Sequence, residues 1–324
     1  MSSEIAVLSS DKDAAEKIRR LVPEGVDVGW VDSTQSLEEQ AAQLDGTVAV
    51  LLTEGLFSLE LAQACPSVRL VQVFSAGTDR LDKQALGELG ITVANNGGGN
   101  AVAVAEHTVT MMVTVYRRLQ LQYASIRARN WKSDLSSNWA NEVHELTDKT
   151  VGIVGFGRIG QQVAKRLQGW DCNLVYHDTF TIPAEVEERL HATKVPLDEL
   201  LSTSDIVTLH MPLNGQTRGM IGDREFDLMK PAAVLINECR GPIVDEAALI
   251  RALREGKIAA AGLDVLEEEP TRADNPLLEM ENVVVTPHMA GTTYEAGEKA
   301  RVFGIGNAMR VAAGGQPESV VPPD

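Results

Sequence analysis

Hydrophobic residues in the first hundred positions fall into short runs rich in Val, Leu and Ile, separated by stretches whose apolar residues recur at helical spacing. Each short run predicts a buried strand, and each intervening stretch predicts a helix. The expected strands are 4–8, 26–31, 47–52, 68–74 and 91–94, and the expected helices are 11–21, a polar one ending near 44, 59–64 and 82–88. Apolar strands that alternate with helices are typical of a parallel sheet covered on both faces.

The pattern after residue 100 predicts a second unit of the same kind. A helix over 101–121 is apolar nearly all round, so we expect it to be buried between two layers. The polar segment 123–148 carries Trp131 and Trp139 without a clear period, which suggests an excursion that packs on another subunit or over a cleft. Further strands are expected at 150–154, 173–176, 205–210, 233–237, 259–265 and 283–286, with helices between them. One of these helices, over 245–254, has Asp245 as its capping acid and Gly256 as its stop.

With 324 residues, the chain is long enough for about two domains. A final helix over 292–312 should cross back to the first unit and make it discontinuous. We therefore predict an α/β fold with two Rossmann-like or flavodoxin-like parallel-sheet domains and a cleft between them. The first domain would comprise residues 1–100 plus 290–324, and the second residues 101–289.

A strand, a glycine-rich turn, a helix and a second strand follow one another between residues 150 and 178. Gly155 permits the tight turn, Gly157 lets the backbone approach a pyrophosphate, and Gly160 lets the helix pack close to the sheet. The unpaired N–H groups at the start of that helix attract phosphates. Asp178 lies 178 − 160 = 18 residues past the last glycine, where a carboxylate can accept hydrogen bonds from a ribose diol. These features together predict a dinucleotide site in the second domain.

The same acid favours NAD over NADP. A carboxylate repels a 2′-phosphate, and Asp178 is followed by Thr179 rather than by an arginine. Three glycines alone would be a weak signal, because many strand-to-helix turns use glycine. The flanking strands and the correctly spaced acid make the signal specific.

Net charge and cysteine content indicate which partners and which environment to expect. Hydrophobic content of 44% and charged content of 23% are ordinary for a soluble enzyme, but the net charge is −17. Such an acidic chain argues against a nucleic-acid partner and against anionic membranes. The three cysteines, Cys65, Cys172 and Cys239, lack metal-ligand spacing, so we expect reduced thiols in a cytoplasmic protein and no metal site. Neither a signal peptide nor an apolar run of membrane-spanning length is visible in the sequence.

Three loop ends carry candidate catalytic residues. Arg240, Glu269 and His288 all come after apolar strands, and the carboxyl ends of parallel strands line the ligand crevice of an open sheet. Hydride transfer to a 2-oxo acid needs a cation for the carboxylate and a proton donor for the developing alkoxide. Arg240 has the planar fork that grips a carboxylate, His288 is the natural general acid, and Glu269 would orient its ring. Taken singly, a lone arginine is more often a surface ion-pair partner and a lone histidine a packed loop residue.

These residues stand in recognisable motifs. Arg-Gly-x-Ile-Val-Asp-Glu-x-Ala-Leu starts at Arg240, Leu-Asp-Val-x-Glu-Glu-Glu-Pro contains Glu269, and Thr-Pro-His ends at His288, all after the Gly-x-Gly-x-x-Gly turn. Over nearly its whole length the chain resembles the D-isomer-specific 2-hydroxyacid dehydrogenases. The resemblance implies NAD-dependent interconversion of a 2-oxo acid and a D-2-hydroxy acid, with Arg240, Glu269 and His288 as the catalytic residues. Glu269 is preferred over its two neighbouring glutamates because it directly precedes the proline.

The resemblance also implies binding roles and a homodimer formed through the nucleotide domain. Segment 74–79 resembles the substrate loop of the family, and segment 95–107 resembles its interdomain motif. The backbone N–H groups of Ala76 and Gly77 should therefore bind the substrate carboxylate, and Asn100 should lie at the cleft. Besides the glycine turn and Asp178, the implied cofactor-binding residues are Arg158 and Ile159 at the pyrophosphate, His210 and Pro212 on the adenosine side, Cys239, and Asp264 at the nicotinamide carboxamide.

The chain departs from the pattern of the family at two places. Glu238 and Cys239 replace the small neutral residues usual before the arginine, which leaves the local field and the cofactor contacts there open. Thr53-Glu54-Gly55 stands where phosphoglycerate-type members carry basic residues. Because no phosphate clamp is visible, and because Leu56 and Phe57 lie nearby, we expect an unphosphorylated substrate: glyoxylate, hydroxypyruvate or an apolar 2-oxo acid.

Two alternatives remain at the level of sequence. Phosphite and formate dehydrogenases share this architecture, although the formate enzymes place glutamine where Glu269 stands. An NAD(H)-sensing corepressor keeps the same fold but acts by binding partners. Nothing in the sequence resembles the disordered regulatory extension of such a sensor. Turnover of NADH across a panel of 2-oxo acids distinguishes an enzyme from a sensor.

Overall fold

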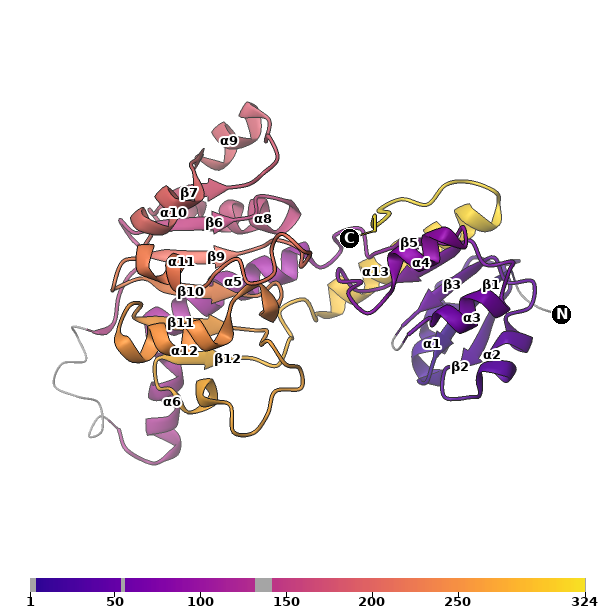
Figure 1. Ribbon diagram of the computed structural model, residues 1–324, viewed down its shortest axis with the longest axis horizontal. Coiled ribbons are helices and arrows are strands. Elements are labelled where there is room, and N and C mark those ends of the chain that lie inside the picture. Colours follow the sequence, from indigo (N-terminus) through magenta and orange to yellow (C-terminus); the bar gives the residue numbers. More distant parts are fainter. Residues whose placement is uncertain (1–3, 54–55, 132–141, 324) are drawn as a thin grey trace. The chain divides into compact units, whose positions relative to one another are not determined.

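A computed structural model describes residues 4–53, 56–131 and 142–323. The chain divides into two compact units (Figure 1). Unit 1 comprises Met1–Asn100 and Thr292–Asp324, and unit 2 comprises Ala101–Gly291.

Unit 1 is a five-stranded parallel sheet in the order β2-β1-β3-β4-β5. The strands are β1 (Ile5–Ser9), β2 (Val28–Asp32), β3 (Ala49–Leu52), β4 (Leu70–Val73) and β5 (Thr92–Ala94). The helices are α1 (Lys12–Arg19), α2 (Leu37–Gln43), α3 (Leu59–Ala64), α4 (Lys83–Glu88) and, from the C-terminal segment, α13 (Tyr294–Ala312). Two hydrophobic clusters cover the two faces of the sheet, and α13 belongs to the one that also contains α1.

Unit 2 is a seven-stranded parallel sheet in the order β12-β11-β10-β9-β6-β7-β8. The strands are β6 (Thr150–Val154), β7 (Asn173–His177), β8 (Ala192–Lys194), β9 (Ile206–Leu209), β10 (Val234–Asn237), β11 (Ala260–Leu263) and β12 (Val283–Val285). The helices are α5 (Ala101–Tyr116), α6 (Leu119–Arg127), α8 (Arg158–Arg166), α9 (Ala184–Leu190), α10 (Leu197–Thr203), α11 (Asp223–Leu228) and α12 (Glu246–Glu255). Short 3₁₀ turns lie at η1 (Leu167–Gly169), η2 (Gly241–Ile243) and η3 (Pro276–Glu279).

Two layers of helices bury the sheet of unit 2 from both sides. One hydrophobic cluster joins α5 and α8 to one face, and a second cluster joins α10, α11 and α12 to the other. Both sheets therefore have the near-continuous apolar strands that a doubly covered parallel sheet requires. The predicted fold class, two parallel-sheet α/β domains, is confirmed.

Local signals account for the ends of several helices. Asp245 accepts a hydrogen bond from the Ala248 N–H and caps α12, and Gly256 ends that helix in the left-handed region with φ 68°. Both ends were expected from the sequence. Ser36 and Glu39 form a reciprocal capping box at the start of α2.

The predicted helix over 101–121 is wrong in its length. Helix α5 ends at Tyr116, Arg118 takes a left-handed conformation with φ 48°, and α6 continues from there. The segment after it, predicted to lack regular structure, therefore begins with a helix. Trp131, within that segment, is exposed, and Trp139 lies outside the described residues. Strand β8 was not predicted, because a three-residue strand of Ala, Thr and Lys has no apolar run.

Within the described ranges, no helix is long and apolar enough to cross a membrane. The described residues also hold no group of three or more His, Cys, Asp or Glu side chains placed to bind a metal ion.

Asp205 joins three strands of unit 2 at their amino ends. Its carboxylate accepts a hydrogen bond from the Thr150 N–H at 2.8 Å and pairs with the Lys230 ammonium at 2.9 Å. Burial alone would raise the pKa of Asp205, but these two partners outweigh it and hold the pKa below its usual value. The ionised carboxylate therefore stabilises the folded state.

We expect Asp205→Ala to lower the free energy of unfolding by about 1–3 kcal/mol at pH 7, because two donors lose a charged acceptor. The folded pKa is lowered, so the contribution is fully present above about pH 4, the pKa of an unfolded aspartate, and is lost as pH falls through the folded pKa. Urea unfolding at pH 7 and pH 3 measures the difference. A difference that does not shrink at the lower pH would contradict the assignment. Asp198→Ala, which removes an exposed pair with Arg224, serves as the control and should change stability by less than about 1 kcal/mol.

Candidate active site

Three adjacent strands of unit 2 bring the predicted catalytic loops to one edge of the sheet. In the parallel register, Asn237 at the end of β10 pairs with Leu263 at the end of β11, and Leu263 pairs with Val285 at the end of β12. Arg240 and His288 each follow three residues after one of these strand ends. Because the strands are parallel and in register, the loops that carry these side chains leave from neighbouring points.

The structure brings His288 and Glu269 together. The His288 Nδ1 lies 2.6 Å from Glu269 Oε2, and the Leu266 N–H donates to the other oxygen, Oε1, at 3.1 Å. A carboxylate only accepts, so His288 donates from Nδ1, and its Nε2 is left for another partner. The two side chains are 48% and 37% exposed, so a ligand can reach the ring.

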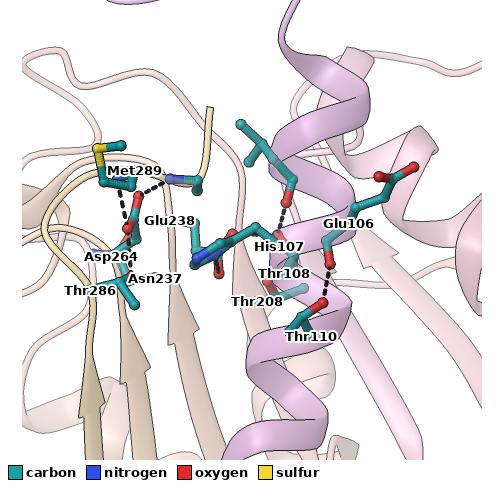
Figure 2. Close-up of polar contacts among 12 residues, drawn as sticks. Glu106, His107, Thr108, Thr110, Thr208, Asn237, Glu238, Asp264, Thr286 and Met289 are labelled. Atoms are coloured by element: carbon teal, nitrogen blue, oxygen red, sulfur yellow. Dashed lines mark hydrogen bonds and ion pairs between the residues drawn. The ribbon is translucent and has the colours of Figure 1, made fainter. Parts of the chain in front are cut away.

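Asp264 holds the loop that carries His288. Its buried carboxylate accepts hydrogen bonds from the Thr286 hydroxyl at 2.5 Å, the Met289 N–H at 2.9 Å and the Ala290 N–H at 2.8 Å, as Figure 2 shows in part. The His288 N–H donates to the Asp264 carbonyl at 2.8 Å. Three of the four lone-pair positions of the carboxylate are used within the loop, so one is left for the predicted carboxamide contact.

The turn after β10 carries Arg240 and touches the Glu269 loop. The Asn237 side-chain amide donates to the Arg240 carbonyl at 3.1 Å, and the Arg240 guanidinium donates to the Cys239 carbonyl at 2.6 Å. A Cβ on Gly241 would lie 1.8 Å from the Leu266 carbonyl oxygen, so only glycine permits this approach of two backbones. The Arg240 turn therefore packs directly on the loop whose Leu266 N–H anchors Glu269.

A further polar group lies beneath this turn. Glu238 is buried, and its carboxyl group contacts His107 Nδ1 at 2.7 Å and the Thr108 hydroxyl at 2.8 Å, both on α5 (Figure 2). Burial raises the pKa of Glu238, and the hydrogen bonds from His107 and Thr108 offset this only in part. The hydrogen bond to Glu238 in turn raises the pKa of His107, despite partial burial.

The glycine turn has the shape that a dinucleotide requires. Gly155 lies in the left-handed region with φ 89°, and a Cβ there would come within 2.7 Å of the His210 carbonyl oxygen. A Cβ on Gly160 would lie 2.2 Å from the Gly155 carbonyl oxygen, whereas a Cβ on Gly157 would meet nothing within 4 Å. Helix α8 begins at Arg158 without a side-chain cap, and the N–H groups in the first turn of a helix attract phosphates. These residues fit a dinucleotide.

The residues around the turn fit the same ligand. Asp178 accepts from the Phe156 N–H at 2.6 Å and the Phe180 N–H at 2.8 Å, one on each oxygen, and keeps lone pairs for a ribose. The buried ring of His210 contacts the Thr208 hydroxyl at 2.9 Å through Nε2, and its Nδ1 has no partner among the described residues. Burial lowers the pKa of His210 to about 3, so the ring is neutral.

The remaining predicted cofactor residues differ in exposure. Arg158 is exposed at the start of α8, Ile159 is half-buried beside it, and Pro212 accepts a hydrogen bond from Thr217 through its carbonyl. The Cys239 side chain packs in the hydrophobic core of unit 2, and burial raises the pKa of its thiol to about 11. A cofactor contact of Cys239 would therefore involve its backbone.

Unit 1 contains the predicted substrate loop. Ala76 and Gly77 lie in a bend after β4, where Asn95 donates to the Ala76 carbonyl at 3.1 Å. Asn100 is the last residue of the first of the two stretches that make up unit 1. The roles of these three residues remain predictions. Phe57, expected near the substrate, is 3% exposed and packs in the core of unit 1, so its proposed contribution to an apolar substrate pocket was wrong.

Comparison with known proteins places the chain in a family. Residues 109–290 match the family described as D-isomer specific 2-hydroxyacid dehydrogenase, NAD binding domain. The chain belongs to this family. The chain is 38% identical over 291 residues to a glyoxylate reductase of Thermococcus litoralis, with 89% of this chain and 86% of the relative covered.

The chain also resembles a longer relative and a solved structure. The chain is 35% identical over 291 residues to a D-3-phosphoglycerate dehydrogenase of Archaeoglobus fulgidus, and the match covers 90% of this chain but 54% of that protein. The chain therefore spans about half the length of that relative. The crystal structure of a glyoxylate reductase from Paecilomyes thermophila superposes with a TM-score of 0.85 and 30% identity, covering 99% of both chains.

Reasoning from the sequence missed two groups of the candidate site. The pairing of Glu238 with His107 was not anticipated, although the unusual glutamate directly after a buried strand was a visible signal. The hydroxyl of Thr286 was not assigned a role, and it donates to the carboxylate that holds the His288 loop. No spacing rule connects these positions, because their partners lie far apart in the chain.

The contrast between two glycines gives a test of the cofactor site that does not depend on turnover. We expect Gly157→Ala to leave thermal stability unchanged and to weaken NADH binding by about tenfold, because its methyl group would occupy the space next to the pyrophosphate. Gly160→Ala should instead lower the free energy of unfolding by about 1–3 kcal/mol, because backbone must shift. Calorimetric unfolding and NADH titration measure both. Unaltered NADH binding by Gly157→Ala would contradict this placement of the dinucleotide.

Proposed function

We propose that the protein is an NAD-dependent reductase that converts an unphosphorylated 2-oxo acid to a D-2-hydroxy acid. The observation that carries the proposal is the His288–Glu269 pair, whose Nδ1 to Oε2 distance is 2.6 Å and whose remaining ring nitrogen is available to a ligand. Such a pair at the carboxyl end of a parallel sheet whose strand β6 leads into a dinucleotide-type glycine turn supports acid–base chemistry on a carbonyl group.

Each residue has a definite part in the proposed reaction. Arg240 binds the substrate carboxylate with its planar guanidinium. When bound, NADH supplies the hydride that adds to the carbonyl carbon. His288 in its doubly protonated form donates the Nε2 proton to the carbonyl oxygen, so that no free alkoxide forms, and becomes the neutral ring with its hydrogen on Nδ1. Glu269 accepts that Nδ1 hydrogen throughout, and its negative charge favours the protonated ring before the transfer.

The preference for NAD over NADP rests on Asp178. Its carboxylate is anchored by the Phe156 and Phe180 N–H groups at the end of β7, so it cannot easily swing away from a 2′-phosphate. A fixed negative charge at the ribose repels that phosphate. We therefore expect NADH to be the better reductant.

The identity of the 2-oxo acid belongs to the proposal. Glyoxylate and hydroxypyruvate are the first candidates, and the similarity to glyoxylate reductases supports them. Leu56 is exposed on unit 1, which supports an apolar neighbourhood, while Phe57 no longer does. The similarity to a D-3-phosphoglycerate dehydrogenase makes 3-phosphoglycerate the competing substrate.

Two further expectations complete the proposal. Exposed apolar side chains gather on and after α6, at Tyr123, Ile126 and Trp131, and we infer that they contribute to a homodimer. The three cysteines are free, which supports a reducing, cytoplasmic environment. Sedimentation of the purified protein tests the dimer, and a monomer at micromolar concentration would contradict it.

We expect His288→Ala to lower kcat by about 10²–10⁴-fold, the usual contribution of a general acid. The Kd for NADH should stay within about twofold, because the ring does not bind the dinucleotide. Steady-state assays and NADH titration measure the two quantities. Equal losses in both would contradict the assignment. His191→Ala is the matched control, since His191 is exposed and shares the left-handed backbone of His288, with φ 48° against 55°.

A substrate panel tests the reaction itself. We expect NADH consumption with at least one of glyoxylate, hydroxypyruvate, pyruvate or phenylpyruvate, and no NADH formation from NAD with 3-phosphoglycerate. Phosphite and formate as hydride donors serve as further arms of the panel. Tight NADH binding without turnover on any member would favour an NAD(H)-sensing protein that acts through partners.

A further inference from the structure

Glu238 is an ionisable side chain with no solvent exposure, and the proposed reaction does not use it. We propose that Glu238 is a positioning residue, whose carboxyl group ties the Arg240 turn to helix α5 and thereby fixes the guanidinium that binds the substrate carboxylate. The inference rests on the proposed function through the role of Arg240. It concerns residues of unit 2 alone.

The contacts of Glu238 reach across two elements that are distant in the sequence. Its Oε1 lies 2.7 Å from His107 Nδ1, and its Oε2 lies 2.8 Å from the Thr108 hydroxyl. Both partners stand on α5, whereas Glu238 directly follows the end of β10. In Figure 2 the two side chains of α5 face the strand ends, on the side where Asp264 lies.

The contact between Thr108 and Glu238 depends on where the hydrogens lie. The Thr108 hydroxyl lies 2.8 Å from the Val104 carbonyl oxygen and 2.8 Å from Glu238 Oε2, but it has a single hydrogen. Either that hydrogen is shared between two acceptors, or Glu238 carries a proton and donates it to Thr108. In both arrangements every oxygen of the carboxyl group has a partner only while α5 stays in place.

The turn itself is held at three points. Asn237 fixes it internally, through its bond to the Arg240 carbonyl and through the Cys239 N–H, which donates to Asn237 Oδ1 at 3.2 Å. Gly241 packs on the backbone of Leu266 and so joins the turn to the Glu269 loop. Glu238 supplies the connection to α5. Arg240 lies between the second and third of these attachments.

The contacts of Glu238 are expected to fix the position of the Arg240 turn. Removing one partner of a buried carboxyl group is strongly unfavourable, because the remaining group cannot regain its hydration. A displaced turn would leave Glu238 in that state, so the turn is held in one position. An apolar side chain at this place would pack without such a directional requirement. The expected loss on removing the contact is therefore in substrate binding, which depends on where the guanidinium lies.

Helix α5 offers a matched pair of substitutions. Thr108→Val removes the hydroxyl that contacts Glu238, whereas Thr110→Val removes a hydroxyl that bonds only the Glu106 carbonyl, at 2.8 Å on the same helix. We expect Thr108→Val to raise KM for the 2-oxo acid by about five- to tenfold with kcat changed less than about twofold. Thr110→Val should change neither by more than about twofold.

Two substitutions of Glu238 itself extend the test. Glu238→Gln can accept from His107 and donate to Thr108, whose hydrogen then bonds the Val104 carbonyl, so it should keep KM within about threefold of wild type. Glu238→Ala should raise KM by about tenfold or more. Hydrogen–deuterium exchange of residues 237–245 should rise in Glu238→Ala and Thr108→Val, and it should remain as in wild type in Glu238→Gln.

The readouts separate failure of this inference from failure of the proposed function. Exchange of residues 237–245 is measured without substrate, so it decides whether the attachment exists even if no 2-oxo acid is turned over. Unchanged exchange in Glu238→Ala overturns the inference. Faster exchange with an unchanged KM also overturns it, when Arg240→Ala raises KM in the same assay, since the contact would then be structural only. Loss of all turnover by the wild type on the substrate panel overturns the proposed function instead.

Discussion

A single buried carboxylate, that of Asp264, organises the edge of the sheet where the candidate catalytic residues meet. It accepts hydrogen bonds from one hydroxyl and two backbone N–H groups of the loop after β12. The backbone carbonyl of Asp264 accepts a further bond from the His288 N–H. A charge that is buried from water is stable only when hydrogen-bond donors surround it. These donors belong to the loop after β12, so the loop is held in one conformation. His288 is thereby delivered to Glu269 by interactions in which neither side chain takes part.

The other two loops are fixed to the same framework by different means. The contact of Gly241 with Leu266 is steric and joins backbone to backbone, while Glu269 takes the Leu266 N–H as its second donor. The register of three parallel strands sets the starting points of all three loops. Residues separated by tens of positions along the chain therefore behave as one unit, and precise placement follows from strand pairing plus a few directional contacts.

Reasoning from the sequence succeeded where the signal is local. Apolar runs predicted the strands of both sheets except β8, and Asp245 with Gly256 predicted the ends of α12, since both signals act within a few residues. It failed where the outcome depends on distant partners. Neither a glycine nor a proline marks the break at Arg118, and Phe57, expected near the substrate, fills a core. The contact between Glu238 and α5 spans more than a hundred residues, and no periodicity encodes it.

The backbone of His288 restricts what could ever stand in its place. With φ 55° it lies in a region that glycine and asparagine enter readily and β-branched residues enter poorly. In a library randomised at this codon, the folded members should therefore be poor in Val, Ile and Thr, whatever chemistry was selected for. A change of proton donor during evolution would favour residues that tolerate this backbone conformation, or would require the loop to take another path.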